Sequence, residues 1–174
     1  MYKIVLLDIP GFLGHLHPLV VHLPIGFLLL AMMFDLLSYF SKYAYLKEAV
    51  SFTLFASFIA AVTSCIFGYL LSLSGDYNDV VLGNHKFAGI ILTIITSLLF
   101  IATTKKAQSF FTIPAGLFSS LFAGVIVLMA YTGHQGGTLT HGSTYLSMET
   151  LTQEHRKKPA NVEDALIFED VVHP

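Results

Sequence analysis

The chain has 174 residues, of which 55% are hydrophobic and only 11% are charged, whereas soluble domains carry roughly 25% charged residues. Its mean hydropathy of +0.72 is typical of a membrane protein. The net charge of −2 and the lack of an extended basic run exclude nucleic-acid binding as a function. The single cysteine, Cys65, and the absence of a CxxCH motif from these residues exclude an intrachain disulfide and a covalently attached haem.

Four apolar runs are long enough to cross a bilayer core of about 30 Å: residues 18–40, 50–73, 87–104 and 110–132. The connectors between them are short, so consecutive helices must run antiparallel. The sequence therefore predicts an all-α polytopic membrane protein, with four transmembrane helices in an up-down bundle within residues 1–142. Residues 143–174 are richer in acidic side chains, and we expect a polar C-terminal tail or linker there.

Lysines are concentrated in the first and third connectors, as Lys42, Lys47, Lys105 and Lys106. Short loops rich in Lys and Arg tend to stay in the cytoplasm. We therefore expect these two connectors to be cytoplasmic and both termini to lie on the outer side.

The histidines follow the opposite pattern to the lysines. Six of the eight lie at the outer ends of the predicted helices: His15, His17, His22, His85, His134 and His141. The two lysine-bearing connectors contain none. Since ionisable side chains are costly in a bilayer, this asymmetry indicates a site for a metal, a haem or protons at the outer boundary. The alternative is a set of solvated interfacial histidines.

The entrance to the first helix carries three of these histidines. On a continuous helix His15 and His22 share a face, while His17 points about 140° away from His22. His22 lies inside the apolar run and is the best single candidate for a functional role. Pro24 removes the hydrogen bond to the Val20 carbonyl, which predicts a kink or an irregular turn. A proline-bent entrance with interfacial histidines is the competing interpretation.

The segment GHQGGTLTHG follows the fourth predicted helix, at residues 133–142. Its four glycines are expected to break the helix and form a loop framed by His134 and His141. Gly136 and Gly137 would let the backbone approach a bound cofactor closely. A flexible exit loop without a ligand is the alternative. His85, near the start of the third helix, lies on the same side.

Small side chains recur every four positions in the second helix (Ala56, Ala60, Ser64, Gly68 and Ser72) and in the fourth (Gly116, Ser120 and Gly124). This spacing favours close approach of helix backbones in lipid. Clearance for a planar macrocycle near Gly68 is the second interpretation.

Asp35 is the one acidic residue inside an apolar run. It lies near the cytoplasmic end of the first helix, about 20 Å from His22 at 1.5 Å per residue, and cannot join the outer site. We expect it to pair with Lys42 or to lie at the interface, with a proton entry point as the alternative.

Two kinds of chemistry suit an outer site built from histidines. A structural zinc finger is excluded because the chain has one cysteine, but a copper or zinc site made of imidazoles alone is possible. The other use is bis-imidazole ligation of a b-type haem. His22 and His85 form the first candidate axial pair, with His17, His134 and His141 as further ligands. The metal alternative uses His22, His85, His134 and His141.

Three sequence motifs carry a family resemblance: LHPLVVHLPIG at 16–26, HKFAGI at 85–90 and GHQGGTLTHGSTYL at 133–146. They resemble a family of four-helix bacterial membrane domains of unknown function, often followed in the same chain by a planctomycete-type cytochrome c domain. The segment IFEDVVHP at 167–174 resembles the lead-in to such a domain. The resemblance implies a membrane anchor for periplasmic cytochrome chemistry, and its motif histidines correspond to His17, His22, His85, His134 and His141.

The leading expectation is an electron-transfer module in the bacterial cytoplasmic (inner) membrane, with both termini periplasmic. It would hold a b-type haem without covalent attachment and pass electrons, with quinol as the candidate donor, to a c-type cytochrome in the same chain or a separate one. A stand-alone enzyme is not expected, since no nucleophile–base or carboxylate pair is recognisable. The alternatives are a non-catalytic anchor or assembly subunit of a respiratory complex, and a copper- or zinc-binding membrane protein.

Overall fold

The computed structural model describes residues 8–142, and this part of the chain is helical with no strand. The helices in chain order are α1 (Ile9–His15), α2 (His17–Val20), α3 (His22–Leu37), η1 (Ser41–Tyr43), α4 (Leu46–Leu71), α5 (Asp79–Thr103), α6 (Lys105–Gln108) and α7 (Ala115–His141). The predicted all-α class is therefore confirmed. The predicted polar tail, 143–174, lies outside the described residues.

Four helical segments of the described chain are long and apolar enough to cross a membrane: His17–Leu37, Leu46–Leu71, Asp79–Thr103 and Ala115–His141. The third begins eight residues before the expected start at 87, because the Asn78 side chain caps α5 by accepting from the amides of Val80 and Val81. The fourth begins after Pro114, whose carbonyl accepts the first amide bond of α7, from Phe118. Proline suits such a helix start.

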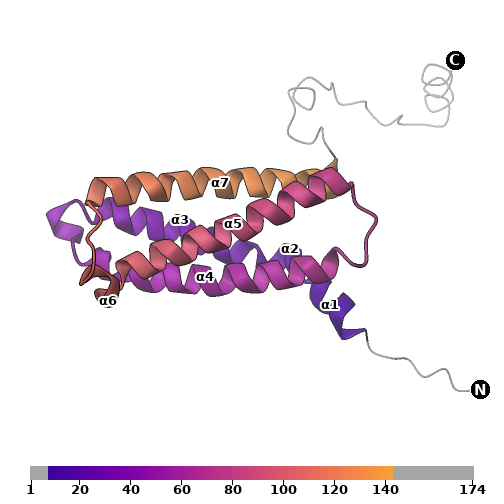
Figure 1. Ribbon diagram of the computed structural model, residues 1–174, viewed down its shortest axis with the longest axis horizontal. Coiled ribbons are helices and arrows are strands. Elements are labelled where there is room, and N and C mark those ends of the chain that lie inside the picture. The colour runs from indigo at the N-terminus through magenta and orange to yellow at the C-terminus, as the bar shows by residue number, and fades with distance from the viewer. Residues whose placement is uncertain (1–7, 143–174) are drawn as a thin grey trace, which may run out of the picture. The chain divides into compact units, whose positions relative to one another are not determined.

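The long helices lie side by side in an up-down arrangement (Figure 1). α4 has the most extensive packing, against α3 and α5, and its C-terminal half also contacts α1 and α2. The backbone of α7 stands further from its neighbours, so its contacts depend on long side chains such as Phe118 and Phe122. Many large apolar side chains point outward, among them Phe52 and Val127, as expected for a surface in contact with lipid.

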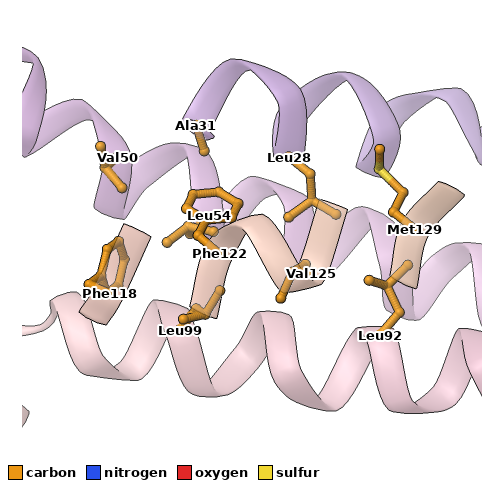
Figure 2. Close-up of a cluster of buried hydrophobic side chains, with 10 residues drawn as sticks. All are labelled: Leu28, Ala31, Val50, Leu54, Leu92, Leu99, Phe118, Phe122, Val125 and Met129. Carbon is orange, nitrogen blue, oxygen red and sulfur yellow. The ribbon is translucent and has the colours of Figure 1, made fainter. Parts of the chain in front are cut away.

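The core of the bundle is apolar and receives side chains from all four long helices. Figure 2 shows these side chains along the axis, from Val50 and Phe118 at one end to Leu92 and Met129 at the other. Phe122 is fully buried at mid-height. The core thus fixes the relative register of the helices and lies between two polar regions at the ends of the bundle.

The helical chain is interrupted at Leu16, just before the first membrane span, and again at Val21, inside it. Two prolines lie just beyond these positions, Pro18 and Pro24, and each lacks the amide that a regular helix would use. Both interrupting residues keep helix-like dihedral angles, so the result is an irregular turn, as predicted. Before it, Gly14 lets α1 approach α4 closely, because a Cβ there would lie 2.7 Å from the amide nitrogen of Leu71.

The predicted glycine loop after the fourth helix is wrong. Residues 133–141 continue α7, which ends at His141 and is followed by Gly142 with a φ of +86°. A left-handed glycine is a common helix terminator. The earlier glycines do not break the helix because an intrahelical bond is the best partner for a backbone amide near lipid, where glycine is well tolerated in helices.

Candidate functional site

Two histidines from different helices meet at the end of the bundle that contains α2, the start of α5 and the C-terminal part of α7. His17 begins α2, and His85 lies in the second turn of α5. Their ring centroids are 6.2 Å apart, and the ring planes are inclined by 81°. Both side chains are half-buried. We call His17 and His85 the histidine pair.

Each ring of the histidine pair is fixed by a backbone carbonyl of a third or fourth helix. His17 Nδ1 lies 2.9 Å from the Ser64 carbonyl oxygen on α4, and His85 Nδ1 lies 3.0 Å from the Thr132 carbonyl oxygen on α7. A carbonyl only accepts, so Nδ1 must carry the proton in both rings. In a neutral imidazole this leaves the lone pair on Nε2, which is the arrangement found in histidines that ligate metals.

Glycines provide the space in which both rings lie. A Cβ built on Gly68 of α4 would lie 2.8 Å from Cε1 of His17 and 3.0 Å from its Nδ1. A Cβ on Gly136 of α7 would lie 3.0 Å from Cε1 of His85. Clearance for a macrocycle near Gly68 was the second interpretation of the small-residue stripe, after helix packing, and in the structure the space at Gly68 is taken by the His17 ring. The lack of a side chain at Gly136 provides the same space for His85.

The small residues of α4 lie at helix contacts, whereas those predicted on the same grounds in α7 do not. On α4, Ala60 and Ser64 are buried between helices, as expected for close helix packing. On α7, Gly116 and Gly124 have nothing within 4 Å of a Cβ position, and Ser120 is exposed. The stripe predicted on the fourth helix does not mediate packing within the described residues.

The other histidines at this end occupy different environments. His15 Nδ1 lies 2.7 Å from the Gly11 carbonyl oxygen of its own helix, and its side chain is exposed. His22 is the first residue of α3 and is exposed, as are His134 and His141 on α7. The structure thus brings His85 together with His17 rather than with His22, the partner favoured by the sequence.

The donor set restricts which groups could be held at the histidine pair. Within residues 8–142, no cluster of three or more His, Cys, Asp or Glu side chains is arranged to hold a metal ion. A protein zinc site normally takes three or four such ligands, so the described residues do not supply one. Two imidazoles from separate helices would be enough protein ligands for a haem iron, because the macrocycle would provide the remaining ones.

A second polar region lies at the opposite end of the bundle. Asp35 is fully buried, and its Oδ1 lies 2.6 Å from Nζ of Lys47. Its Oδ2 accepts a short hydrogen bond from the Ser119 hydroxyl, which also lies 3.0 Å from the Tyr39 hydroxyl. The prediction that Asp35 pairs with Lys42 is wrong, because the Lys42 ammonium group lies over the Tyr43 ring. Lys47 lies one helix further on, at the start of α4, where it reaches the carboxylate.

These features define an integral membrane protein with four spanning helices and a histidine pair at one end. The chain belongs to the family of predicted membrane proteins DUF2231, whose family model matches residues 14–144. No curated protein and no solved structure matched the sequence. The matched region includes the histidine pair and the two glycines on which the rings lie.

Proposed function

We propose that the protein is a membrane-embedded electron-transfer module that holds a b-type haem between His17 and His85. When bound, the haem supplies a one-electron couple whose potential depends on its axial ligands and their surroundings. The protein would supply the axial imidazoles, their orientation and an apolar environment.

The spacing of the two rings is the observation that carries this proposal. Two metal–nitrogen bonds of about 2 Å, with each ring centre about 1 Å behind Nε2, would separate the centroids by about 6 Å. The observed separation is 6.2 Å. The hydrogen bonds from Nδ1 to the Ser64 and Thr132 carbonyls support the same role, because they direct the lone pair to Nε2.

The position of the site supports a redox partner outside the cytoplasm. Lys42, Lys47, Lys105 and Lys106 all lie at the end opposite the histidine pair, where the lysine distribution favours the cytoplasm. We therefore propose a bacterial cytoplasmic membrane with the histidine pair on the periplasmic side and both termini periplasmic. The electron acceptor would be a c-type cytochrome, in the same chain or separate, and quinol is the proposed donor.

A second candidate function uses the same ring spacing. A single copper ion bound by two imidazoles would separate the centroids by a similar distance, and imidazole is a good copper ligand. A non-catalytic anchor or assembly subunit is the third candidate, in which the two histidines only link helices through their bonds to the Ser64 and Thr132 carbonyls.

One preparation distinguishes these candidates. The full-length protein is expressed in bacteria with ample haem supply, purified in detergent and analysed for iron, copper and the reduced-minus-oxidised visible spectrum. The proposal predicts iron as haem, an α-band on reduction and complete extraction of the haem by acidic acetone, because no thioether bond holds it. Stoichiometric copper without iron would support the second candidate. A colourless protein without either metal would contradict the haem and copper candidates, and the anchor or assembly subunit would be the remaining one.

A further inference from the structure

The interior of the bundle contains five buried polar residues: Asp35, Thr53, Ser57, Ser64 and Thr96. We call them the polar column. In a membrane-spanning bundle such residues are costly, and an ionisable one suggests a function. They lie at successive levels between the Lys47 end and the histidine pair, as the contacts below establish.

The levels follow from contacts between antiparallel helices. Asp35 of α3 meets Lys47 of α4, and Thr53 and Ser57 follow on α4 at steps of about 9 and 6 Å, at 1.5 Å per residue. Further along α4, the Ser64 carbonyl binds His17.

Thr96 fills the longest gap in this series, between Ser57 and Ser64. On the facing α5, Thr103 bonds to Ser51, and Thr93 lies 3.3 Å from Sγ of Cys65. Thr96 therefore lies level with residues 58–62 of α4. The five residues are thus distributed at separate levels along the length of the core, where the Thr53 and Ser57 hydroxyls donate to the Ala49 and Pro24 carbonyls.

Two hydroxyls of the polar column lack hydrogen-bond partners among the described residues: Ser64 Oγ, on a residue 7% exposed, and Thr96 Oγ1, on a residue that is fully buried. Buried hydroxyls are nearly always paired, with protein or with ordered water. Ordered water is the partner that such a hydroxyl takes when the protein offers none.

The Asp35 end of the polar column opens toward the surface. A cavity of about 150 Å³ is lined by Lys47, Gln108, Thr112 and Phe118, among other residues. Lys47 is about half exposed and bonds to the buried carboxylate at 2.6 Å. The cavity has room for several waters, so water in it reaches Lys47, whose ammonium group is paired with the buried Asp35 carboxylate.

We propose that the polar column conducts protons along the bundle axis, with the Asp35–Lys47 pair as its entrance. A proton moves from the Lys47 ammonium to the Asp35 carboxylate, and Lys47 regains one from water in the cavity. The neutral carboxylic acid then releases its proton to water beside the next hydroxyls. Only O–H and N–H bonds are made and broken, and no redox step is involved. This activity goes beyond the proposed electron transfer and needs no cofactor.

The test measures proton flux through the full-length protein in lipid vesicles. A pH-sensitive dye is trapped inside, valinomycin and potassium compensate the charge, and the external pH is stepped. Wild-type vesicles should equilibrate several-fold faster than protein-free vesicles. Asp35→Asn should return the rate to that of protein-free vesicles, and equal rates with wild-type protein and without protein would overturn the proposal.

Two further variants test the proposal independently, in case Asp35→Asn fails to fold. Ser64→Ala and Thr96→Val remove hydroxyls that have no protein partner, so the fold should tolerate them, and each should slow the flux several-fold. Ser120→Ala, on the exposed face of α7, is the matched control and should keep the wild-type rate. If Ser64→Ala and Thr96→Val conduct as fast as Ser120→Ala, the polar column is not the path.

Discussion

The two ends of the bundle treat their polar side chains differently. At the Asp35 end, a carboxylate, an ammonium group and a hydroxyl satisfy one another within the protein. At the other end, His17 and His85 are each anchored through Nδ1 to a carbonyl, which keeps the lone pair of Nε2 for another partner. The first arrangement compensates charge, whereas the second orients ligands. This difference is why we place ligand chemistry at the histidine pair and not at the aspartate.

The largest effect on stability is expected from breaking the Asp35–Lys47 pair on the lysine side. Lys47→Met leaves a fully buried carboxylate without its countercharge, which should lower the free energy of unfolding by about 3 kcal/mol. Unfolding by denaturant in detergent measures this. Lys42→Met, which removes an ammonium group lying over a surface tyrosine, should change stability by less than about 1 kcal/mol.

A double variant sharpens that comparison. Adding Asp35→Asn to Lys47→Met removes the unpaired charge and should recover most of the lost stability, because the penalty comes from the carboxylate and not from the missing lysine. If the double variant is less stable than Lys47→Met alone, the ion pair is not the cause of the loss.

The next effect concerns the close approach of α1 to α4. Gly14→Ala would place a Cβ 2.7 Å from the Leu71 amide nitrogen, and backbone cannot move aside easily, so we expect a loss of about 2 kcal/mol. Gly26→Ala is the matched control, since a Cβ there meets nothing within 4 Å. It should be neutral or stabilise the helix by up to about 1 kcal/mol.

Replacing Gly68 or Gly136, on which the two rings lie, should disturb the histidine pair selectively. Gly68→Ala would push the His17 ring out of place, because its Cβ would lie 2.8 Å from Cε1. Haem content per chain should fall strongly. Gly136→Ala should lower it less, since the corresponding distance to His85 is 3.0 Å. Gly124→Ala, which faces open space, should keep the wild-type content; equal losses in all three variants would contradict this account.

The smallest effect is expected from Ser119→Ala. The hydroxyl donates to Asp35 Oδ2, but the carboxylate keeps its bond to Lys47, so the loss should be about 1 kcal/mol in unfolding experiments. Ser120→Ala removes only an exposed bond to the Gly116 carbonyl on the same helix and should have no measurable effect.

The sequence predicted the membrane class, the four spans and the gathering of histidines at one end, because length, hydropathy and residue type determine these features. From the sequence we favoured His22 over His17 as the partner of His85, because depth in the apolar run was the only criterion for choosing between them. The Leu16 and Val21 interruptions instead direct His17 toward α4, and the ring is held by a backbone carbonyl, which no residue type can reveal. The signal that pointed to this place was Gly68, for which clearance was only the second interpretation, after helix packing.

The glycine segment shows a second limit of local patterns. Glycines after a long helix predict a break when water can take over the backbone bonds. Here α7 continues through Gly133, Gly136 and Gly137, and one of them provides room for a ring from another helix. Pairing of Asp35 with Lys47 rather than Lys42 was equally beyond the sequence, since it depends on the turn between α3 and α4.

The most direct test of the central claim compares the haem content of three single variants of the full-length protein: His17→Gln, His85→Gln and His22→Gln. Each is purified from cells with the same haem supply, and haem per chain is determined from the absorbance of the extracted pyridine complex. The account predicts loss of bound haem in His17→Gln and His85→Gln, with wild-type content in His22→Gln. Retention of haem in His17→Gln together with its loss in His22→Gln would contradict the histidine pair as the site.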